Sequence, residues 1–237
     1  MKGNIVLKFG GSLLFTENKE IDQEKVMQFC RIFKDRKADY NKLVIICGGG
    51  RIARDYIEAV RKFTENEALC DIFGIELSRL NAKLIISAFQ DYTYPLVVKT
   101  IEELSKALLF NKPIIMGGLQ PGQSTTSVAL EVAEFINADQ LVILTDVDGI
   151  YDKDPKKNKD AELQQNLNYE QLQEIIIGIS GNKQAAAGEY RIFDMVSLQI
   201  LKRSKIKVLV MSGENLENFG NYWNEDKNII GTNISSK

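Results

Sequence analysis

The sequence predicts an α/β fold built on a mainly parallel sheet with helices on both of its sides. Short apolar, β-branched segments alternate along the chain with longer segments whose apolar residues recur at helical spacing. Several of the short segments carry apolar residues at successive positions, as strands covered on both faces do. No linker, repeat or low-complexity segment divides the 237 residues, so one α/β domain is expected.

Six segments have the composition of strands, and three apolar stripes between them predict helices. The expected strands are residues 5–9, 43–47, 95–98, 113–116, 140–145 and 207–211. The stripes repeat at intervals of three and four residues, which places their members on one helix face: Val26, Phe29, Cys30 and Phe33; Ile52, Tyr56, Val60 and Phe63; Val128, Val132 and Phe135. Alternation of this kind is typical of parallel sheets with right-handed crossovers.

Composition and charge exclude several classes of function. The 30 Lys and Arg residues balance 32 Asp and Glu residues, so neither nucleic acid nor an anionic membrane is an expected partner. The absence of histidine excludes Ser-His-Asp and Cys-His catalysis and histidine-based zinc sites. The cysteines Cys30, Cys47 and Cys70 lack C-x-x-C spacing, which disfavours a zinc knuckle or a disulfide framework. With no signal-like segment and no run of 18 apolar residues, we expect a soluble cytoplasmic protein.

Glycines follow four of the expected strands, and they are the most informative feature of the chain. They occur at Gly10-Gly11, at Gly48-Gly49-Gly50, at Gly117-Gly118 with Gly122, and at Gly149. In an open α/β sheet, ligands bind beyond the carboxyl ends of the strands. Glycine there lets backbone N–H groups approach a ligand closely, and the helix that follows attracts anions. Four such loops in register predict a site for a large polyanion.

One of these loops comes close to a P-loop without matching it. Residues 117–124 fit the pattern G-x-x-x-x-G-K-[ST] except that Gln123 replaces the lysine. A neutral amide cannot supply the charge that meets the β- and γ-phosphates, so a P-loop NTPase is disfavoured. The loop remains a backbone nest, with Gln123, Ser124 and Thr125 as donors for one phosphate or another polar ligand.

Taken together, these segments resemble the amino-acid-kinase superfamily and, more closely, the archaeal-type uridylate (UMP) kinases. Residues 7–12 and 48–54 are similar to the first and second phosphate loops of the superfamily. Residues 71–82 resemble the acceptor-side helix of UMP kinases, and residues 118–125 their acceptor loop. Residues 145–151, with Asp154-Pro155, resemble the segment that holds the ATP base and ribose. The resemblance extends from about residue 4 to residue 232.

The resemblance implies a three-layer α/β/α sandwich like that of acetylglutamate kinase, with an acceptor lobe of about residues 1–120 and an ATP lobe of about 121–237. It implies transfer of the γ-phosphate of ATP to UMP, giving UDP and ADP for pyrimidine nucleotide biosynthesis. Mg²⁺ would be bound through the ATP phosphates rather than by protein side chains, and the assembly would be a homohexamer. Such a reaction needs positioning and charge neutralisation more than a strong base, which suits a chain without histidine.

The same resemblance assigns roles to individual residues. Lys8 would be catalytic, stabilising charge on the transferring phosphoryl group. The implied ATP-binding residues are Gly10, Gly11, Ser12, Gly50, Arg54, Thr145, Asp146, Tyr151 and Asp154. The implied UMP-binding residues are Gly49, Arg54, Asp71, Leu119, Gln120, Pro121, Gly122, Gln123, Ser124 and Thr125.

Three positions depart from the family pattern and leave alternatives open. Gln199 stands where many members have a late-helix lysine, Thr126 where many have an aspartate, and Asp146 where archaeal-type sequences have asparagine. An acyl-phosphate-forming kinase of the acetylglutamate or carbamate type is one alternative, and a nucleotide-binding regulator without turnover is another. An isopentenyl-phosphate kinase is disfavoured because its acceptor site uses histidine. The apolar stripe of Val26, Phe29 and Phe33, with the long segment 67–89, predicts an oligomer.

Overall fold

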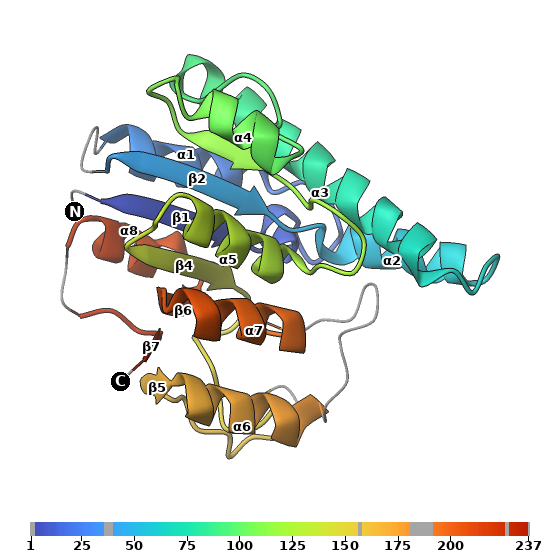
Figure 1. Ribbon diagram of the computed structural model, residues 1–237, viewed down its shortest axis with the longest axis vertical. Coiled ribbons are helices and arrows are strands. Elements are labelled where there is room, and N and C mark those ends of the chain that lie inside the picture. The colour runs from blue at the N-terminus through green and yellow to red at the C-terminus, as the bar shows by residue number, and fades with distance from the viewer. Residues whose placement is uncertain (1–2, 36–39, 156–157, 181–191, 226–227, 237) are drawn as a thin grey trace.

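The structure, a computed structural model, describes residues 3–35, 40–155, 158–180, 192–225 and 228–236, and within them seven strands form one mixed sheet (Figure 1). The strand order is β3-β2-β1-β4-β6-β7-β5. All neighbouring pairs are parallel except β6 and β7. The strands are β1 (Asn4–Phe9), β2 (Lys42–Cys47), β3 (Ile114–Met116), β4 (Gln140–Thr145), β5 (Asn166–Asn168), β6 (Lys207–Ser212) and β7 (Thr232–Ser235).

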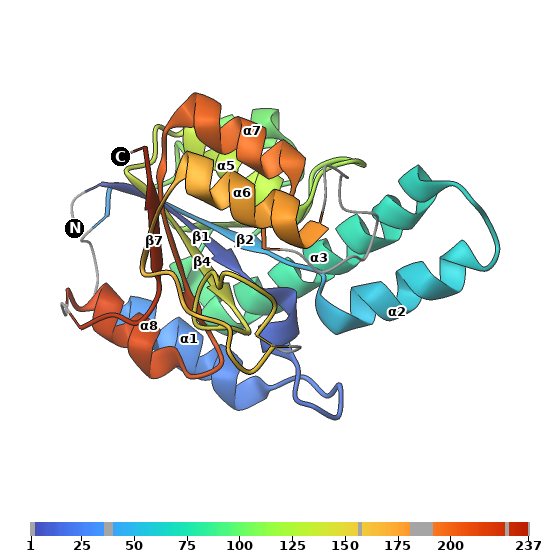
Figure 2. The ribbon, with the colours of Figure 1, turned by 90° about the horizontal axis from the view of Figure 1, so that it is seen from below.

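Helices cover both faces of the sheet, which gives the three-layer α/β/α arrangement (Figure 2). One face packs against α4 (Ile101–Ala107), α5 (Thr125–Phe135), α6 (Tyr169–Ser180) and α7 (Met195–Ser204). The other face packs against α1 (Gln23–Asp35), α3 (Glu67–Phe89) and α8 (Leu216–Trp223), with short 3₁₀ helices η1 (Gly11–Leu14) and η2 (Gln90–Tyr92). The expected fold class is confirmed.

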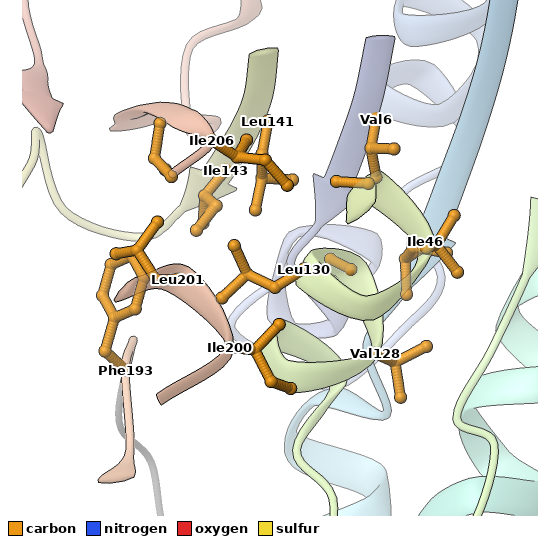
Figure 3. Close-up of a cluster of buried hydrophobic side chains, with 14 of the residues drawn as sticks. Val6, Ile46, Val128, Leu130, Leu141, Ile143, Phe193, Ile200, Leu201 and Ile206 are labelled. Atoms are coloured by element: carbon orange, nitrogen blue, oxygen red, sulfur yellow. The ribbon is translucent and has the colours of Figure 1, made fainter. Parts of the chain in front are cut away.

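Alternate residues of the central strands feed two separate cores, because successive side chains of a strand point to opposite faces. On the α5 side, Val6 and Ile143 of the sheet meet Val128, Leu130 and their neighbours (Figure 3). On the α1 side, the core contains a cluster of aromatic rings among its aliphatic side chains. Its ring contacts join the sheet to three helices and η2, through Phe9, Phe29, Phe33, Phe89, Tyr92, Phe219 and Trp223.

A helical pair stands apart from both cores. Helix α2 (Gly50–Arg61) packs along the first half of α3, and the pair projects from the body of the molecule (Figure 2). Its own buried cluster consists of Ile57, Val60 and Cys70. Helices α2 and α3 approach closely at Gly74, where a Cβ atom would lie 3.2 Å from the Ile57 Cδ1 atom. We call α2 together with residues 67–75 of α3 the arm.

Several expectations need correction. Residues 95–98 form no strand; only Val98 bridges to Met116. Strands β5 and β7 were not expected, because three or four partly polar residues give no strand pattern. The α2 stripe was only partly correct: Val60 is buried as expected, but the other buried residues are Ala53 and Ile57, while Tyr56 and Phe63 are exposed. In the α5 stripe, Phe135 is exposed.

The α1 stripe was predicted correctly but does not support the oligomer that was inferred from it. Val26, Phe29, Cys30 and Phe33 are all buried in the aromatic core, so they leave no surface for a partner. The three cysteines are free and buried, and burial raises the pKa of the Cys30 and Cys47 thiols to about 12. Within the described part of the chain, no helix is long and apolar enough to cross a membrane.

Candidate active site

A cavity of about 690 Å³ opens at the carboxyl ends of β1, β2, β3 and β4, where the glycine loops were expected to meet. Its wall includes most of the residues proposed from the sequence: Lys8, Gly10, Gly11, Ser12, Gly49, Gly50, Arg54, Asp71, Pro121, Gly122, Gln123, Ser124, Thr125, Thr145 and Asp146. The structure does not bring Leu119, Gln120, Tyr151 or Asp154 into this wall.

The loops after β1 and β2 touch each other through their backbones. A Cβ atom on Gly11 would lie 2.3 Å from both the Gly48 carbonyl oxygen and the Gly50 nitrogen. Gly50 has a φ of +73°, and a Cβ atom there would lie 2.4 Å from the Gly11 oxygen. Only glycine fits at these two positions, because the neighbouring atoms belong to backbone that cannot move aside.

Helix N-termini also converge on the cavity. Helix α2 begins at Gly50, and α5 begins after Ser124, whose hydroxyl accepts a hydrogen bond from the Ser127 N–H. The first N–H groups of a helix have no partner within the helix, and the helix dipole adds partial positive charge. The cavity therefore offers backbone donors to an anion from two directions.

Lys8 supplies a buried cation at the inner end of the cavity. It lies on β1 between Ile46 of β2 and Ile143 of β4, and its side chain shares the α5 face of the sheet with Val6. Burial lowers the pKa of Lys8 to about 8, although the Asp146 carboxylate opposes this shift. A lysine held in so little water interacts strongly with any phosphate that enters.

Carboxylates lie on the same side of the cavity. Asp146 follows β4 directly and accepts a hydrogen bond from the Thr145 hydroxyl at 3.3 Å. Asp194 is buried at the start of α7, where its Oδ1 accepts hydrogen bonds from the Ser197 N–H at 2.7 Å and the Ser127 hydroxyl at 3.3 Å. The sequence reasoning missed Asp194 as a site residue. Its spacing to Ser197, typical of a helix N-cap, was the available signal.

The opposite wall is formed by the arm and the loop after β3. Asp71 on α3 accepts a hydrogen bond at 2.8 Å from the N–H of Gly122, the residue at the exposed turn of that loop. Arg54 lies one turn into α2 and lines the same wall. Gln123 donates from Nε2 to Glu131 at 3.0 Å, while its buried Oε1 has no hydrogen-bond partner.

Three polar residues of α3 support these loops and were also missed. Asn81 donates to the Gly48 and Gly49 carbonyl oxygens at 2.8 and 3.2 Å. Ser78 accepts from the Gly118 N–H at 2.7 Å, and the neighbouring Arg79 side chain reaches the same loop. Ser78 and Asn81 are both buried, three residues apart on one face of α3, and polar residues on a buried helix face were the available signal.

The remaining proposed positions lie outside the cavity wall. The Tyr151 hydroxyl donates to Asp148 at 3.4 Å, and the Asp154 carbonyl accepts from the Asn158 N–H at 2.9 Å, so their role in ATP binding stays a prediction. Thr126, which departs from the family pattern, is buried in the cavity wall, whereas Gln199 is exposed on α7 and does not line the cavity. Among the described residues, no group of three Cys, Asp or Glu side chains could hold a metal ion.

Comparison with known proteins shows the family of this chain. A model of the amino acid kinase family matches residues 4–212. The chain belongs to the amino acid kinase family. Among relatives, it is 39% identical over 233 residues to the uridylate kinase of Methanobrevibacter smithii, covering 98% of this chain and 99% of that protein. It is 41% identical to the uridylate kinase of Thermofilum pendens, with 88% of each chain covered.

Solved structures of amino acid kinase family proteins share the fold. The uridylate kinase of Archaeoglobus fulgidus superposes with a TM-score of 0.81 at 33% identity, covering 98% of this chain and all of that one. The UMP kinase of Ureaplasma parvum superposes with a TM-score of 0.80 at 18% identity, covering 99% of each chain. The second match shows the fold alone, since its identity is low.

Proposed function

We propose that the protein is a UMP kinase, which transfers the γ-phosphate of ATP to UMP and gives UDP and ADP. One observation carries the proposal: a single cavity joins the buried Lys8 and two interlocked glycine loops to a wall that holds Asp71, Arg54 and the loop after β3. Relatives that are about 40% identical over most of the chain are named uridylate kinases, which gives the proposal independent support.

The reaction places few demands on acid–base chemistry. An oxygen of the UMP phosphate attacks the γ-phosphorus of ATP and forms the new P–O bond, while the bond from that phosphorus to the β,γ-bridging oxygen breaks and ADP leaves. Lys8 stabilises the charge on the transferring phosphoryl group, and the N–H groups of Gly11 and Ser12 bind the ATP phosphates. The Gly10 N–H donates to the Leu144 carbonyl oxygen at 2.9 Å, so Gly10 shapes this loop rather than donating to a phosphate. The Lys8 amine must carry its proton to do this, and a bound phosphate favours the protonated form.

UMP lies against the arm in this proposal. Arg54 binds its phosphate, Asp71 accepts from a ribose hydroxyl through the carboxylate oxygen not used by Gly122, and residues 121–125 of the loop after β3 lie around the base. ATP lies toward Thr145, Asp146, Tyr151 and Asp154. Residues 1–120 then form the acceptor lobe and residues 121–237 the ATP lobe.

Mg²⁺ fits this cavity as the companion of ATP. The ion would be held by the ATP phosphates, and the carboxylates of Asp146 and Asp194 in the wall would accept hydrogen bonds from its bound water. The ion supplies neutralisation of charge on the phosphates when it is bound.

We further propose that the enzyme acts as a homohexamer in the cytoplasm, where its nucleotides are available. Apolar side chains gather on the exposed surface of the arm and continue along α3, namely Tyr56, Leu69, Ile72, Phe73 and Leu80, and the rings of Tyr56 and Phe73 are stacked. Surface of this kind is usually covered by a partner. Light scattering at micromolar concentration tests the proposal, and a monomer would contradict it.

A coupled assay of ADP release tests the function itself. With Mg²⁺ and ATP, we expect turnover with UMP that exceeds turnover with acetylglutamate or carbamate by more than about 100-fold, because a site that binds both ribose and phosphate rejects acceptors without them. Preference for a carboxylate or carbamate acceptor would support the acyl-phosphate alternative. Nucleotide binding without turnover with any acceptor would support the regulator.

A further inference from the structure

One turn of α3, residues 78–81, holds both loops that shape the acceptor side of the cavity. Asn81 holds the loop after β2 through the Gly48 and Gly49 carbonyls. Ser78 and Arg79 hold the loop after β3 at Gly118 and Leu119. The two loops come from different strands, so this turn fixes the distance between them.

Each of the three guanidinium nitrogens of Arg79 makes a hydrogen bond to the protein. Its Nε donates to the Gly118 carbonyl oxygen at 3.1 Å, and its second terminal nitrogen donates to the Leu119 carbonyl oxygen at 3.1 Å. The remaining nitrogen pairs with Glu76 at 2.6 Å. Because all three guanidinium nitrogens bond to protein groups, and Arg79 itself does not line the cavity, Arg79 is arranged to hold the loop rather than a phosphate.

The backbone leaves the loop no freedom at its start. A Cβ atom on Gly117 would lie 2.7 Å from the backbone nitrogen of Arg79 and 2.7 Å from the Ser78 Oγ. The loop therefore begins in close contact with α3. Beyond Leu119 the chain is exposed through Gln120, Pro121 and Gly122 until it enters α5. The direction of this exposed stretch is therefore set by the hydrogen bonds of Arg79 to the carbonyl oxygens of Gly118 and Leu119, which precede it.

We propose that Arg79 is a positioning residue for the acceptor nucleotide: it aims the loop of residues 118–124 so that Gly122, Gln123 and Ser124 face the acceptor phosphate and base. The inference rests on the proposed UMP kinase function. A neutral side chain at position 79 loses the hydrogen bonds to the Gly118 and Leu119 carbonyl oxygens, so the loop can adopt conformations that do not bind UMP. The ATP side, built on the loops after β1 and β4, keeps its geometry.

Kinetics of the full-length protein test the proposal. We expect Arg79→Gln to raise KM for UMP about tenfold, since it removes two hydrogen bonds from a charged donor. Both kcat and KM for ATP should stay within about twofold. Arg79→Lys, which can reach one carbonyl but lacks the planar fork, should raise KM for UMP by about threefold.

Two matched controls separate positioning from charge. Glu76→Gln removes the ion pair but leaves both carbonyl contacts, and Arg203→Gln removes an exposed arginine that pairs with Glu134 outside the cavity. Both should leave KM for UMP within about twofold of the wild type. A tenfold rise in the Glu76 variant, or equal rises for UMP and ATP in the Arg79 variant, would overturn the proposal.

Hydrogen exchange gives a readout that needs no turnover. In Arg79→Gln, amides of residues 117–123 should exchange at least about tenfold faster than in the wild type, while those of β1 and β4 are unchanged. Unchanged exchange in residues 117–123 would contradict the positioning role even if KM moved. A wild-type protein that fails to phosphorylate UMP would instead refute the proposed function, and the exchange result would stand separately.

Discussion

The two walls of the cavity are held in different ways. The inner wall lies at the carboxyl ends of the central strands, where the loops after β1 and β2 touch mainly through the backbone of Gly11, Gly48 and Gly50. One α3 side chain, Asn81, adds hydrogen bonds to the Gly48 and Gly49 carbonyl oxygens. The outer wall is the arm, whose own buried cluster has three residues, and the loop after β3. Side chains of α3 hold that outer wall: Asp71, Ser78 and Arg79 each bond to the loop's backbone.

This difference indicates which kinds of substitution each wall tolerates. A backbone-to-backbone contact has no adjustable atoms, so any added side chain displaces a whole loop. Contacts made by side chains can be removed singly, and each removal should change affinity by a limited factor. The inner wall is thus suited to binding the phosphates that take part in every turnover, and the outer wall to selecting the acceptor.

The largest effect is expected from Gly11→Ala. Its Cβ atom would lie 2.3 Å from backbone atoms of the neighbouring loop, so we expect a loss of about 3 kcal/mol or more in the free energy of unfolding, together with loss of activity. Gly178→Ala in α6, where nothing lies within 4 Å of the added Cβ, is the control and should be neutral or slightly stabilising. Urea denaturation measures both. A Gly11→Ala protein as stable as the wild type would show that the inner wall can adjust.

Lys8→Met should lower kcat by about 10²–10³, because it removes the cation beside the transferring phosphoryl group. Binding of ATP and of UMP should change only a few-fold. Lys207→Met, at the exposed start of β6, is the matched control and should leave kcat unchanged. Single-turnover measurements give the comparison, and a folded Lys8→Met protein with normal kcat would remove Lys8 from the mechanism.

The same lysine gives a pH dependence with a defined sign. Its pKa is about 8 in the folded protein and 10.5 in the unfolded chain, so between these values the unfolded state binds more protons and stability rises with pH. Below pH 8 the burial of the charge is fully unfavourable, by roughly 3 kcal/mol. Lys8→Met should therefore be more stable than the wild type at pH 7, and this difference should vanish toward pH 10.5. In turnover, kcat/KM should fall above about pH 8 as the free enzyme loses this proton.

On the outer wall, Asp71→Asn and Arg54→Ala should each raise KM for UMP by about 10–150-fold, since hydrogen bonds to charged groups contribute ~1.5–3 kcal/mol. KM for ATP should move little. The double variant should be less than additive, because both side chains contact one ligand. Calorimetry with UMP alone checks this, and normal UMP affinity in both single variants would show that the acceptor is another molecule.

The smallest effect is expected from Gln123→Ala. Its amide is held by Glu131, and its buried Oε1 has no protein partner, so a donor on the acceptor nucleotide can use it. Loss of one neutral hydrogen bond corresponds to a rise of about three- to tenfold in KM for UMP. If the variant lost ATP affinity and kept UMP affinity, the two nucleotides would have to be exchanged between the walls.

The inner wall could be predicted from the sequence far better than the outer wall. Strands β1, β2 and β4 were placed within one residue, because apolar runs buried on both faces have few alternative structures. The glycines at their ends then led to the cavity, which they line, without any knowledge of side-chain positions. Residues 95–98 show the limit of this reasoning, since an apolar run at the sheet edge gave one bridge and no strand.

The outer wall depends on tertiary contacts that no local pattern shows. The α2 stripe was only partly correct because Ala53 and Ile57, rather than Tyr56, face α3. The contacts of Ser78 and Arg79 with Gly118 join residues more than 30 positions apart. Such contacts are set by the packing of α3, and a single sequence does not reveal them.

The central claim is that the two walls bind different nucleotides, and hydrogen exchange with one ligand at a time tests it most directly. UMP alone should protect the amides of residues 50–79 and 118–125, whereas a non-hydrolysable ATP analogue with Mg²⁺ should protect those of residues 8–13 and 145–154. Protection of the arm by the ATP analogue with none from UMP would contradict the account, as would identical protection patterns for the two ligands.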